Sequence, residues 1–306
     1  MRDVGRLVIC LGCTCADNVF ELDEIPLTPI KVSAFRRVKR GGGPAATGAV
    51  ACAKLNMGAE LWSWLGRDAE GEFLRASLQR HGVDVTNTPL RDGADTVVAF
   101  VLVDRRGERM IVSHGNFPMQ HRIGHLPLER VAKADAVLVD SYWQTGAVAV
   151  LEAARAAGVP AVFDAEGRDA DTLMDLARRA SVPVFSEEGF ERVSGGAAPD
   201  SASCAALADR LGAAMVVGVT LGSRGSLWWL DGGLAHVPAL PVVVQDTTGA
   251  GDVFHGALAA ALAERMELLE AARFASAAAS LKCALGNGWD GMPDRVAVEQ
   301  AMRQLA

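Results

Sequence analysis

The sequence has little of what would assign it to several specialised classes of protein. Of its 306 residues, 22% are charged and 6% are aromatic, with a single tyrosine. The net charge is −7 and there is no basic tail, which argues against a general nucleic-acid binder, because affinity for a phosphate backbone rests on lysine and arginine. No apolar run is long enough to cross a bilayer, and the apolar stretch near the N-terminus has no cleavage site. We therefore expect no membrane partner and a cytoplasmic location.

Cysteine is scarce, and its arrangement does not predict a metal centre. Three of the six cysteines, Cys10, Cys13 and Cys15, form a CxxCxC pattern. A structural zinc site takes four ligands, however, and no second cluster follows in the sequence. The other three cysteines are scattered, so we expect buried, reduced thiols in a reducing compartment. The six histidines form no HExxH pattern, and we assign no metal to them.

Hydrophobic residues make up half of the chain and glycine contributes 32 positions, which suits a large α/β domain with a buried sheet. Short apolar runs alternate with helical patterns along the sequence. The expected strands are 7–12, 60–65, 136–140, 159–164, 182–185 and 215–220. The expected helices are 44–55, 69–81, 146–157, 250–265 and 271–285. This order predicts a mainly parallel sheet with helices on both faces, and ligands at the carboxyl ends of its strands.

Three further segments have the composition of extended chain. Residues 19–40 look extended, and residues 96–114 are typical of a hairpin with its turn at 105–108. These two segments do not fit the alternation of strands and helices. Val242, Val243 and Val244 form a third run, which looks like a short strand leading into a glycine-rich motif.

That motif, DTTGAGDVFHG at residues 246–256, predicts an anion site with its own base. The first N–H groups of a helix have no partner within it and carry the positive end of its dipole, so Gly249, Ala250 and Gly251 would cradle a phosphate. Asp252, in the first turn, is expected to remain ionised and to accept a proton from a hydroxyl that attacks the phosphate. Taken alone, the motif also fits an ordinary glycine turn before a helix.

The motif resembles the C-terminal signature of the PfkB (ribokinase-like) carbohydrate kinases, and three more motifs follow the family order. These are GGGPAATGAVACAKL at 41–55, GRDAEG at 66–71 and TLGSRG at 220–225. Within the family, the stretches GGGPAAT, VFHGALAAAL and RFASAAASLKC are most similar to those of bacterial sulfofructose kinases. The resemblance covers nearly the whole chain.

The resemblance implies a ribokinase-like α/β fold and one kinase domain over residues 1–306. Segments of about 17–40 and 95–116 would form a small β-sheet lid over the sugar, and the lids of two chains would pair in a homodimer. The implied reaction is ATP-dependent transfer of the γ-phosphate to a primary hydroxyl of a sugar, with Mg²⁺ and a monovalent cation such as K⁺. A lid suits this chemistry, because excluding water prevents transfer of phosphate to water.

The resemblance also assigns residues to the sugar. Asp17 matches a carboxylate that accepts hydrogen bonds from sugar hydroxyls, and Gly42 and Gly43 match the pair that lets the sugar approach the backbone. Thr47 replaces the usual asparagine and offers one hydroxyl in place of an amide, which departs from the ribose-binding pattern.

Basic residues gather between positions 31 and 40 of this acidic chain. Lys31 matches a lysine that contacts the sulfonate in sulfofructose kinases, while Ser113 and Tyr142 stand where those enzymes have an asparagine and an arginine. An anionic sugar, sulfofructose-like or a keto-acid sugar, is one interpretation. A charged, solvated edge strand is the other.

On the nucleotide side, the resemblance implies that the loop at 220–225 lines ATP, through Thr220, Gly222, Ser223 and Gly225. Asn287 would border the adenine or a cation loop, and Asp246 and Thr248 resemble the family's potassium ligands. The family's NxxE sequence, which organises magnesium, is replaced by residues 186–189. Ser186 and Glu187 are the expected substitutes, since the phosphates still require Mg²⁺.

Two other functions remain open at this stage. A nucleoside kinase of the same family would use aromatic residues around Tyr142, Trp143 and Phe117 to stack a base. A sugar sensor without catalysis is the second, although it would have no need of an intact GAGD.

Overall fold

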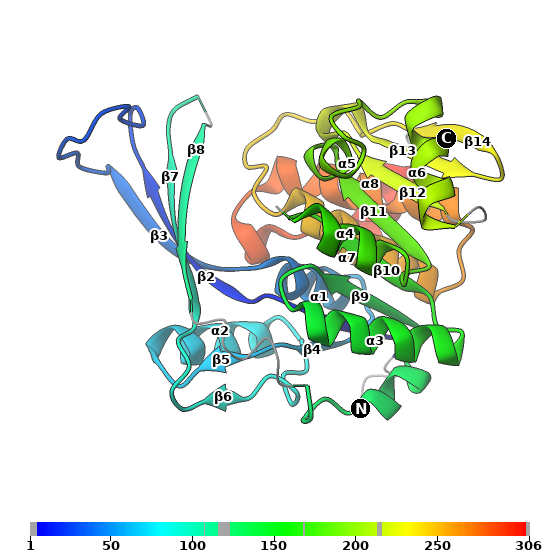
Figure 1. Ribbon diagram of the computed structural model, residues 1–306. Coiled ribbons are helices and arrows are strands. Elements are labelled where there is room, and N and C mark those ends of the chain that lie inside the picture. Colours follow the sequence, from blue (N-terminus) through cyan, green and yellow to red (C-terminus); the bar gives the residue numbers. More distant parts are fainter. Residues whose placement is uncertain (1–4, 107, 116–122, 168, 213–215, 304–306) are drawn as a thin grey trace.

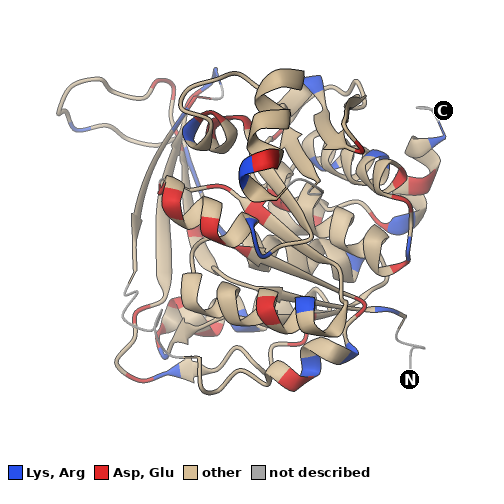
Figure 2. Ribbon diagram, turned by 45° about the vertical axis from the view of Figure 1, so that its right-hand side comes forward, with Lys and Arg blue, Asp and Glu red and all other residues tan. Residues whose placement is uncertain are grey.

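The computed structural model describes residues 5–106, 108–115, 123–167, 169–212 and 216–303. Its two larger sheets stand side by side (Figure 1). Phe117, position 116 of the expected lid and Met215 of an expected strand lie outside the described residues. Figure 2 shows basic and acidic residues interspersed over the outer helices, with no face of one sign in that view.

The large sheet has eight strands in the order β14-β13-β12-β11-β10-β9-β1-β4. The six strands from β12 to β4 are parallel, and β13 and β14 are antiparallel. Their bounds are β1 Leu7–Leu11, β4 Gly58–Trp62, β9 Ala136–Asp140, β10 Ala161–Ala165, β11 Val182–Ser186, β12 Val217–Thr220, β13 Ser226–Leu230 and β14 Gly233–Val237. The predicted mainly parallel sheet is confirmed.

Two predictions at the antiparallel end of the sheet need correction. The strand expected at Val242, Val243 and Val244 is wrong, because the segment has no strand pairing and the side chains of Val243 and Val244 are 85% and 57% exposed. The sheet instead ends in the β13–β14 hairpin, which the sequence analysis missed. Its turn residues Asp231 and Gly232 both have positive φ, the signature of a two-residue hairpin.

Helices cover both faces of the large sheet, as predicted (Figure 1). Their bounds are α1 Pro44–Lys54, α2 Ala69–Arg80, α3 Gln144–Ala157, α4 Ala170–Ala177, α5 Glu187–Val193, α6 Ser201–Leu211, α7 Ala250–Ala263, α8 Leu268–Leu285 and α9 Arg295–Met302. The short 3₁₀ helices are η2 Leu128–Lys133, η3 Gly222–Arg224 and η4 Gly288–Gly291.

The two faces of the sheet bury separate cores, because neighbouring residues of a strand point to opposite sides. In β9, Ala136 and Leu138 pack with α1, α7 and α8, whereas Val137 and Val139 pack with α3, α4, α5 and α6. Each strand in the middle of the sheet is therefore apolar on both faces, which explains why the sequence shows continuous apolar runs there.

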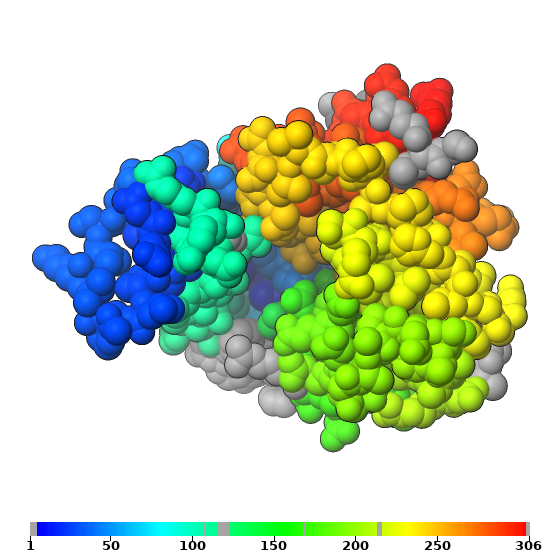
Figure 3. Space-filling model, turned by 90° about the horizontal axis from the view of Figure 1, so that it is seen from above, coloured from blue at the N-terminus to red at the C-terminus, as the bar shows by residue number. Residues whose placement is uncertain are grey.

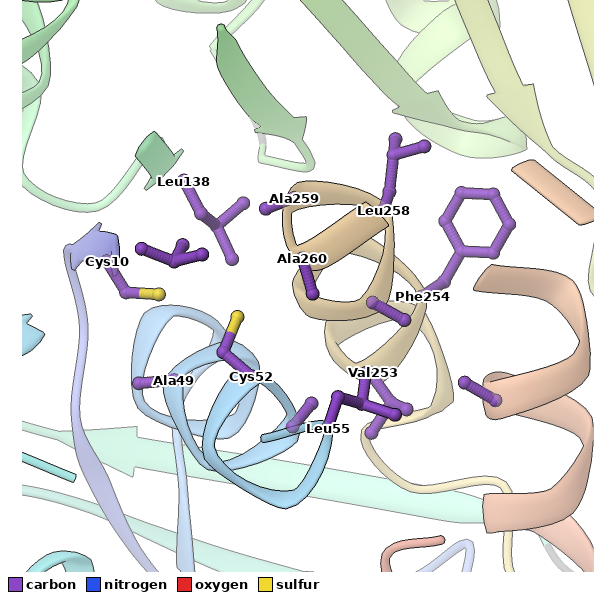
Figure 4. Close-up of a cluster of buried hydrophobic side chains, with 14 of the residues drawn as sticks. Cys10, Ala49, Cys52, Leu55, Leu138, Val253, Phe254, Leu258, Ala259 and Ala260 are labelled. Carbon is purple, nitrogen blue, oxygen red and sulfur yellow. The ribbon is translucent and has the colours of Figure 1, made fainter. Parts of the chain in front are cut away.

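The close contact of α1 with α7 is made through two glycines. A Cβ atom on Gly256 would lie 2.5 Å from the carbonyl oxygen of Gly48, and a Cβ on Gly48 would lie 2.5 Å from the side chain of Leu138. The Cys52 thiol also donates to the carbonyl of Gly256 at 3.2 Å. Figure 4 shows the two helices packed together over Cys10 and Leu138. The contact holds the start of α7 beside the glycine-rich turn that precedes α1.

A second, four-stranded sheet stands at the carboxyl edge of the first, in the order β3-β2-β7-β8. Its strands are β2 Cys15–Glu21, β3 Arg36–Gly42, β7 Val97–Val103 and β8 Arg109–His114. The expected hairpin at 96–114 is confirmed, while the segment 19–40 is divided into two strands by an exposed loop. We call this sheet the lid sheet. A two-stranded pair, β5 Leu65–Gly66 and β6 Leu90–Arg91, lies apart from both.

We predict that Gly256→Ala lowers the free energy of unfolding by about 1–3 kcal/mol, because the added methyl group overpacks a backbone contact. This loss has to exceed the gain of up to about 1 kcal/mol in helix propensity that the same change brings. Urea denaturation measures the effect. Gly124→Ala, at a position with open space around it, is the matched control. A Gly256→Ala protein as stable as the wild type would contradict the contact.

Candidate active site

The carboxyl ends of β1, β9 and β10 meet where the lid sheet joins the molecule. Asp140, the last residue of β9, accepts hydrogen bonds from the backbone N–H groups of Cys13, Ala45 and Tyr142, at 2.7, 3.2 and 2.9 Å. Burial raises the pKa of Asp140 to about 6, although these three donors favour the charged form. A single buried carboxylate thus fixes the turn after β1 and the start of α1.

The first turn of α7 lies in the same region. Gly249 has a left-handed backbone (φ 74°), and the Val253 N–H donates to its carbonyl at 3.0 Å. Within the described part of the chain, the N–H groups of Gly249 and Gly251 donate to no other group. The expectation for Ala250 is corrected, because its N–H is used in a turn to the carbonyl of Thr247 at 3.2 Å. Two glycine amides, not three amides in a row, are free to hold an anion.

Three cavities surround this helix end. The inner pocket, of about 60 Å³, is lined by Asp17, Val19, Arg40, Gly41, Gly42, Gly43, Thr47, Thr248, Gly249, Asp252, Lys282, Gly288 and Trp289. The helix pocket, of about 600 Å³, includes Thr220, Gly222, Ser223, Gly225, Thr247, Ala250, Gly251 and Phe254. The lid groove, of about 830 Å³, lies between the lid sheet and residues 244–248 and 285–287. Figure 3 shows the cleft between the lid strands and the rest of the molecule.

Asp252 is not an ordinary ionised carboxylate. Burial and the negative charges of Asp164 and Glu166 raise its pKa to about 8, while His255 opposes the shift. The expectation that Asp252 remains ionised at the helix start is therefore corrected, because a pKa of about 8 favours the protonated form at neutral pH. Three carboxylates close together outweigh the helix dipole, whose effect on a charge is small.

His255 lies behind Asp252 and not in the helix pocket. Its Nδ1 is 2.8 Å from the carbonyl of Gly251 and 3.5 Å from a carboxylate oxygen of Asp164, and the ring is buried. Burial lowers the pKa of His255. The neutral ring packs between the helix and β10, so it supports the acidic cluster without neutralising it.

The substrate-side residues near the glycine turn come together as the sequence implies. Asp17 lies within β2, and a Cβ atom on Gly42 would be 2.2 Å from its carboxylate, so only glycine fits there. Burial raises the pKa of Asp17 to about 6, against the hydrogen bond from Cys15 and the charge of Arg40. Gly43 (φ 94°) allows the sharp entry into α1.

Thr47 and Trp289 form the floor of the inner pocket. The indole N–H of Trp289 donates to the Thr47 hydroxyl at 3.0 Å, and a Cβ atom on Gly41 would lie 2.2 Å from the ring. Trp289 was not among the residues expected at the site, although it lies two positions after Asn287, which was expected to border the adenine or a cation loop. The Thr47 hydroxyl can still donate one hydrogen bond into the pocket.

Three residues expected to bind an anionic sugar do not line any of the three cavities. Lys31 lies in the exposed loop between β2 and β3, which extends beyond the lid sheet. Ser113 pairs with Ala99 in exposed strand β8, two strands from Asp17. Tyr142 is 42% exposed beyond the end of β9. The structure does not bring these side chains to the inner pocket, because matched positions in sequence do not fix the path of a long loop.

Arginines from the lid sheet line the cavities instead of these three residues. Arg40 donates to Asp246 at 3.0 Å, and its buried Nε has no hydrogen-bond partner among the described residues. Arg109 is 3.5 Å from the same carboxylate and donates to Thr247 at 2.7 Å. Overall, five arginines and three carboxylates line the lid groove. The groove is therefore positively charged.

Some of the residues expected on the nucleotide side line the helix pocket, and others do not. Thr220, Gly222, Ser223 and Gly225 line the helix pocket next to Ala250 and Gly251. Asn287 does not line it; this residue, with a left-handed backbone, borders the lid groove beside Gly286.

The two residues expected to replace NxxE are engaged elsewhere. The Ser186 hydroxyl caps α5 by accepting the N–H of Gly189 at 3.0 Å, and Glu187 forms an ion pair with Arg224. A Cβ atom on Gly189 would lie 2.4 Å from the carbonyl of Ala165, so the family glutamate has no room there.

The two residues expected to hold a monovalent cation, Asp246 and Thr248, bind a lysine side chain instead. The ammonium group of Lys282 donates to the backbone carbonyls of Asp246 and Thr248. Burial works against ionisation of Asp246, but hydrogen bonds from Thr248 and the charges of Lys282 and Arg40 hold its pKa below the ordinary value. Among the described residues, no group of three or more histidine, cysteine or acidic side chains is arranged to hold a metal ion.

All six cysteines are free thiols, and five of them are buried. Burial raises the pKa of Cys13 and Cys15, which keeps these thiols protonated. The CxxCxC residues are thus part of the packing between the lid sheet and the core.

Comparison with known proteins matches this geometry to a family. A family model described as "pfkB family carbohydrate kinase" matches residues 6–295 of the chain. The chain belongs to the PfkB family of carbohydrate kinases. It is 30% identical over 320 residues to a ribokinase of Arabidopsis thaliana, covering 97% of this chain and 81% of the relative. It is 28% identical over 327 residues to fructokinase-1 of Oryza sativa, covering 99% of each.

Solved structures agree with the family assignment. The structure of Arabidopsis thaliana ribokinase complexed with ribose and ATP is 28% identical, with a TM-score of 0.84, and the match covers 98% of this chain and 99% of that one. This PfkB protein is thus a phosphotransferase with a hydroxyl acceptor, a sugar or nucleoside kinase with the ribokinase-like fold. None of its described helices is both long and apolar enough to cross a membrane.

We predict that Asp252→Asn stabilises the folded protein above neutral pH. Because the folded-state pKa of about 8 exceeds the ordinary aspartate value of 3.8, the folded state binds a proton that the unfolded chain releases, and wild-type stability falls as pH rises between these values. Asparagine does not titrate. The difference in unfolding free energy, variant minus wild type, should increase by about 1 kcal/mol or more between about pH 5 and about pH 9. Urea denaturation at both pH values measures it, and a constant difference would contradict the raised pKa.

Proposed function

We propose that residues 1–306 act as one kinase domain that transfers the γ-phosphate of ATP to a primary hydroxyl of a sugar with an anionic substituent. The lid segments, about 17–40 and 95–116, cover the sugar. In this proposal the sugar occupies the inner pocket and the adjoining lid groove, and ATP occupies the helix pocket.

The proposal is carried by the position of the α7 N-terminus between two cavities. Asp252 and Gly249 line the inner pocket, whereas Ala250 and Gly251 line the helix pocket. A phosphoryl group in transfer has to contact its donor and its acceptor at once, roughly in line. A helix end that borders both cavities can hold the group throughout the transfer.

Each residue at this junction then has one role. Asp17 accepts hydrogen bonds from sugar hydroxyls, and the close backbone of Gly42 and Gly43 limits how the sugar lies. Asp252 takes the proton from the attacking hydroxyl. The N–H groups of Gly249 and Gly251 donate to the oxygens of the transferred phosphoryl group, whose charge must be stabilised as the bonds change.

Magnesium fits the carboxylates at the end of β10 better than those at the end of β11. Glu187 is paired with Arg224, and Gly189 has no room for a side chain. The Asp164 carboxylate is buried and lies 3.5 Å from a His255 ring nitrogen, and Glu166 follows it two residues later. Mg²⁺ is usually held by one or two carboxylates together with substrate phosphates, so Asp164 and Glu166 would hold it. When bound, it neutralises phosphate charge.

The raised pKa of Asp252 also suits a general base. A carboxylate with a pKa near the working pH is a stronger base than an ordinary aspartate, so it removes a hydroxyl proton more readily. In the free enzyme, the Asp252 carboxyl group is then partly protonated at neutral pH.

We predict that Asp252→Asn lowers kcat by about 10²- to 10⁴-fold, because the variant loses the base. The variant should still bind ATP, which isothermal titration calorimetry measures, since the residues of the helix pocket are unchanged. In the wild type, log kcat/KM should rise with pH through the pKa of Asp252. Turnover by Asp252→Asn near the wild-type rate would remove this residue from the mechanism.

The charge of the site supports an anionic sugar. Arg40, Arg109 and Lys282 all lie within 4.0 Å of the Asp246 carboxylate, so three positive charges face one negative charge. Arg40 also borders both the inner pocket and the lid groove. A carboxylate, phosphate or sulfonate at the far end of the sugar would balance the excess charge and accept the free Nε–H of Arg40.

We predict that Arg40→Met raises KM for an anionic sugar by about 10- to 100-fold, because a charge-assisted hydrogen bond is lost. KM for a neutral sugar should change much less. Arg37→Met is the matched control, since Arg37 lies on the opposite face of β3 and donates to Asn18. A coupled ATPase assay with neutral, acidic, phosphorylated and sulfonated sugars measures both constants.

Equal effects on anionic and neutral sugars would contradict an anion site at Arg40. The same assay separates the other functions. Turnover with nucleosides and not with sugars would favour a nucleoside kinase, and sugar binding without any phosphate transfer would favour a sensor.

We also propose that two chains pair through their lid sheets. Large apolar side chains are exposed on the lid sheet and its loop: Leu27, Ile30, Val32, Phe35, Phe100, Met110, Ile111 and Val112. A monomeric protein rarely exposes so many apolar side chains in one region. Burying them against a second lid would also support the loop that carries Lys31.

A further inference from the structure

The segment expected to bind a monovalent cation is occupied by a cation of the chain itself. The Lys282 ammonium donates to the carbonyl of Asp246 at 3.1 Å and to the carbonyl of Thr248, and it lies 4.0 Å from a carboxylate oxygen of Asp246. A K⁺ ion bound by protein uses the same type of ligand, because carbonyl oxygens replace its hydration shell. The ligands at this place are thus already used, and a K⁺ ion does not fit beside the ammonium.

The burial of Lys282 shows that this contact is part of the built site. The side chain is 1% exposed, although it lies in a stretch of α8 made mostly of small and apolar residues. Burial lowers the pKa of Lys282, and the charge of Asp246 opposes that shift. The other charged or ionisable groups that act on it are Arg40 and Arg109 from the lid sheet and the neighbouring Cys283. A buried ammonium requires such partners, since an unpaired one is very costly.

Lys282 also lies next to the proposed reaction. It lines the inner pocket together with Gly249 and Asp252. Its two carbonyl partners belong to the turn that precedes α7, and this turn is also joined to α8 by hydrogen bonds from the N–H groups of Gln245 and Asp246 to the Cys283 carbonyl. The ammonium therefore fixes the turn and places one positive charge directly behind the free amides of the helix end.

We propose that Lys282 is a positioning residue that replaces the monovalent cation, so that phosphoryl transfer by this chain does not require K⁺. The inference rests on the proposed transfer at Asp252. A tethered ammonium is present at every turnover and needs no binding equilibrium, whereas an ion has to be captured from solution. A kinase of this kind works at the same rate whether or not the surroundings contain potassium.

The first test uses the wild-type protein. Its kcat is measured in tetramethylammonium chloride and then with KCl added at constant ionic strength. The expected change is less than about 2-fold, because the Lys282 ammonium already uses the carbonyls of Asp246 and Thr248. Stimulation by K⁺ of more than about 10-fold would overturn the proposal, whatever the variants do.

The second test removes the ammonium group. Lys282→Met keeps the length and apolar contacts of the side chain but leaves the two carbonyls without a cation. Without K⁺, kcat should fall by about 10-fold or more relative to the wild type. Added KCl or NH₄Cl should then raise kcat of the variant by about 10-fold or more, because K⁺ or NH₄⁺ occupies the position of the missing ammonium group. Lys133→Met, at an exposed lysine in η2, is the control and should show no response to K⁺.

A third measurement does not depend on turnover. KCl should raise the melting temperature of Lys282→Met but not that of the wild type, because an ion that binds only the folded state stabilises it. Thallium(I) NMR should likewise detect binding to the variant alone. If Asp252→Asn kept its turnover, the proposed mechanism would fail while these two readouts still decided the role of Lys282. A variant that is fully active without K⁺ and binds no thallium would overturn the inference.

Discussion

The site depends on the close packing of α1 against α7 at Gly48 and Gly256. The absence of side chains there lets the two helix backbones touch. This contact brings the turn at 41–43 beside the turn at 248–251, although about two hundred residues separate them in the chain. The inner pocket is the space between the two turns. A larger residue at either position would separate the groups that hold the sugar from those that hold the phosphoryl group.

Around this contact, buried charges of both signs are kept apart. Asp140, Asp164 and Asp252 lie at the strand ends and the helix start, where burial raises their pKa values. On the other side of α7, lysine and arginine side chains converge on Asp246. The helix N-terminus therefore lies between a proton-accepting cluster and a positive one. This arrangement suits a reaction that moves a proton one way and negative charge another.

Most of the fold could be predicted because its signals are local. Continuous apolar runs identified the parallel strands, since each of these strands packs on both faces. The errors fall where a local signal was weak or misleading. The valines at 242–244 have the composition of a strand but no edge left to pair with, because β13 and β14 already complete that end of the sheet. The β13–β14 hairpin takes that edge instead; its first strand has only four apolar residues in a row, Leu227 to Leu230, and its turn is the short pair Asp231-Gly232.

The sequence by itself determined the family, the alternation of strands and helices, and the grouping of Asp17, Gly42, Gly249 and Asp252, because glycine turns and helix starts have short, recognisable patterns. Only the tertiary structure decided that Asp252 has a raised pKa, that Lys31 does not line the inner pocket, and that Arg40, Trp289 and Lys282 do. In the sequence, Lys282 is one charge in a stretch of small and apolar residues near the end of α8. The burial of a side chain and the charges around it depend on residues that are distant in sequence, so no local sequence pattern predicts them.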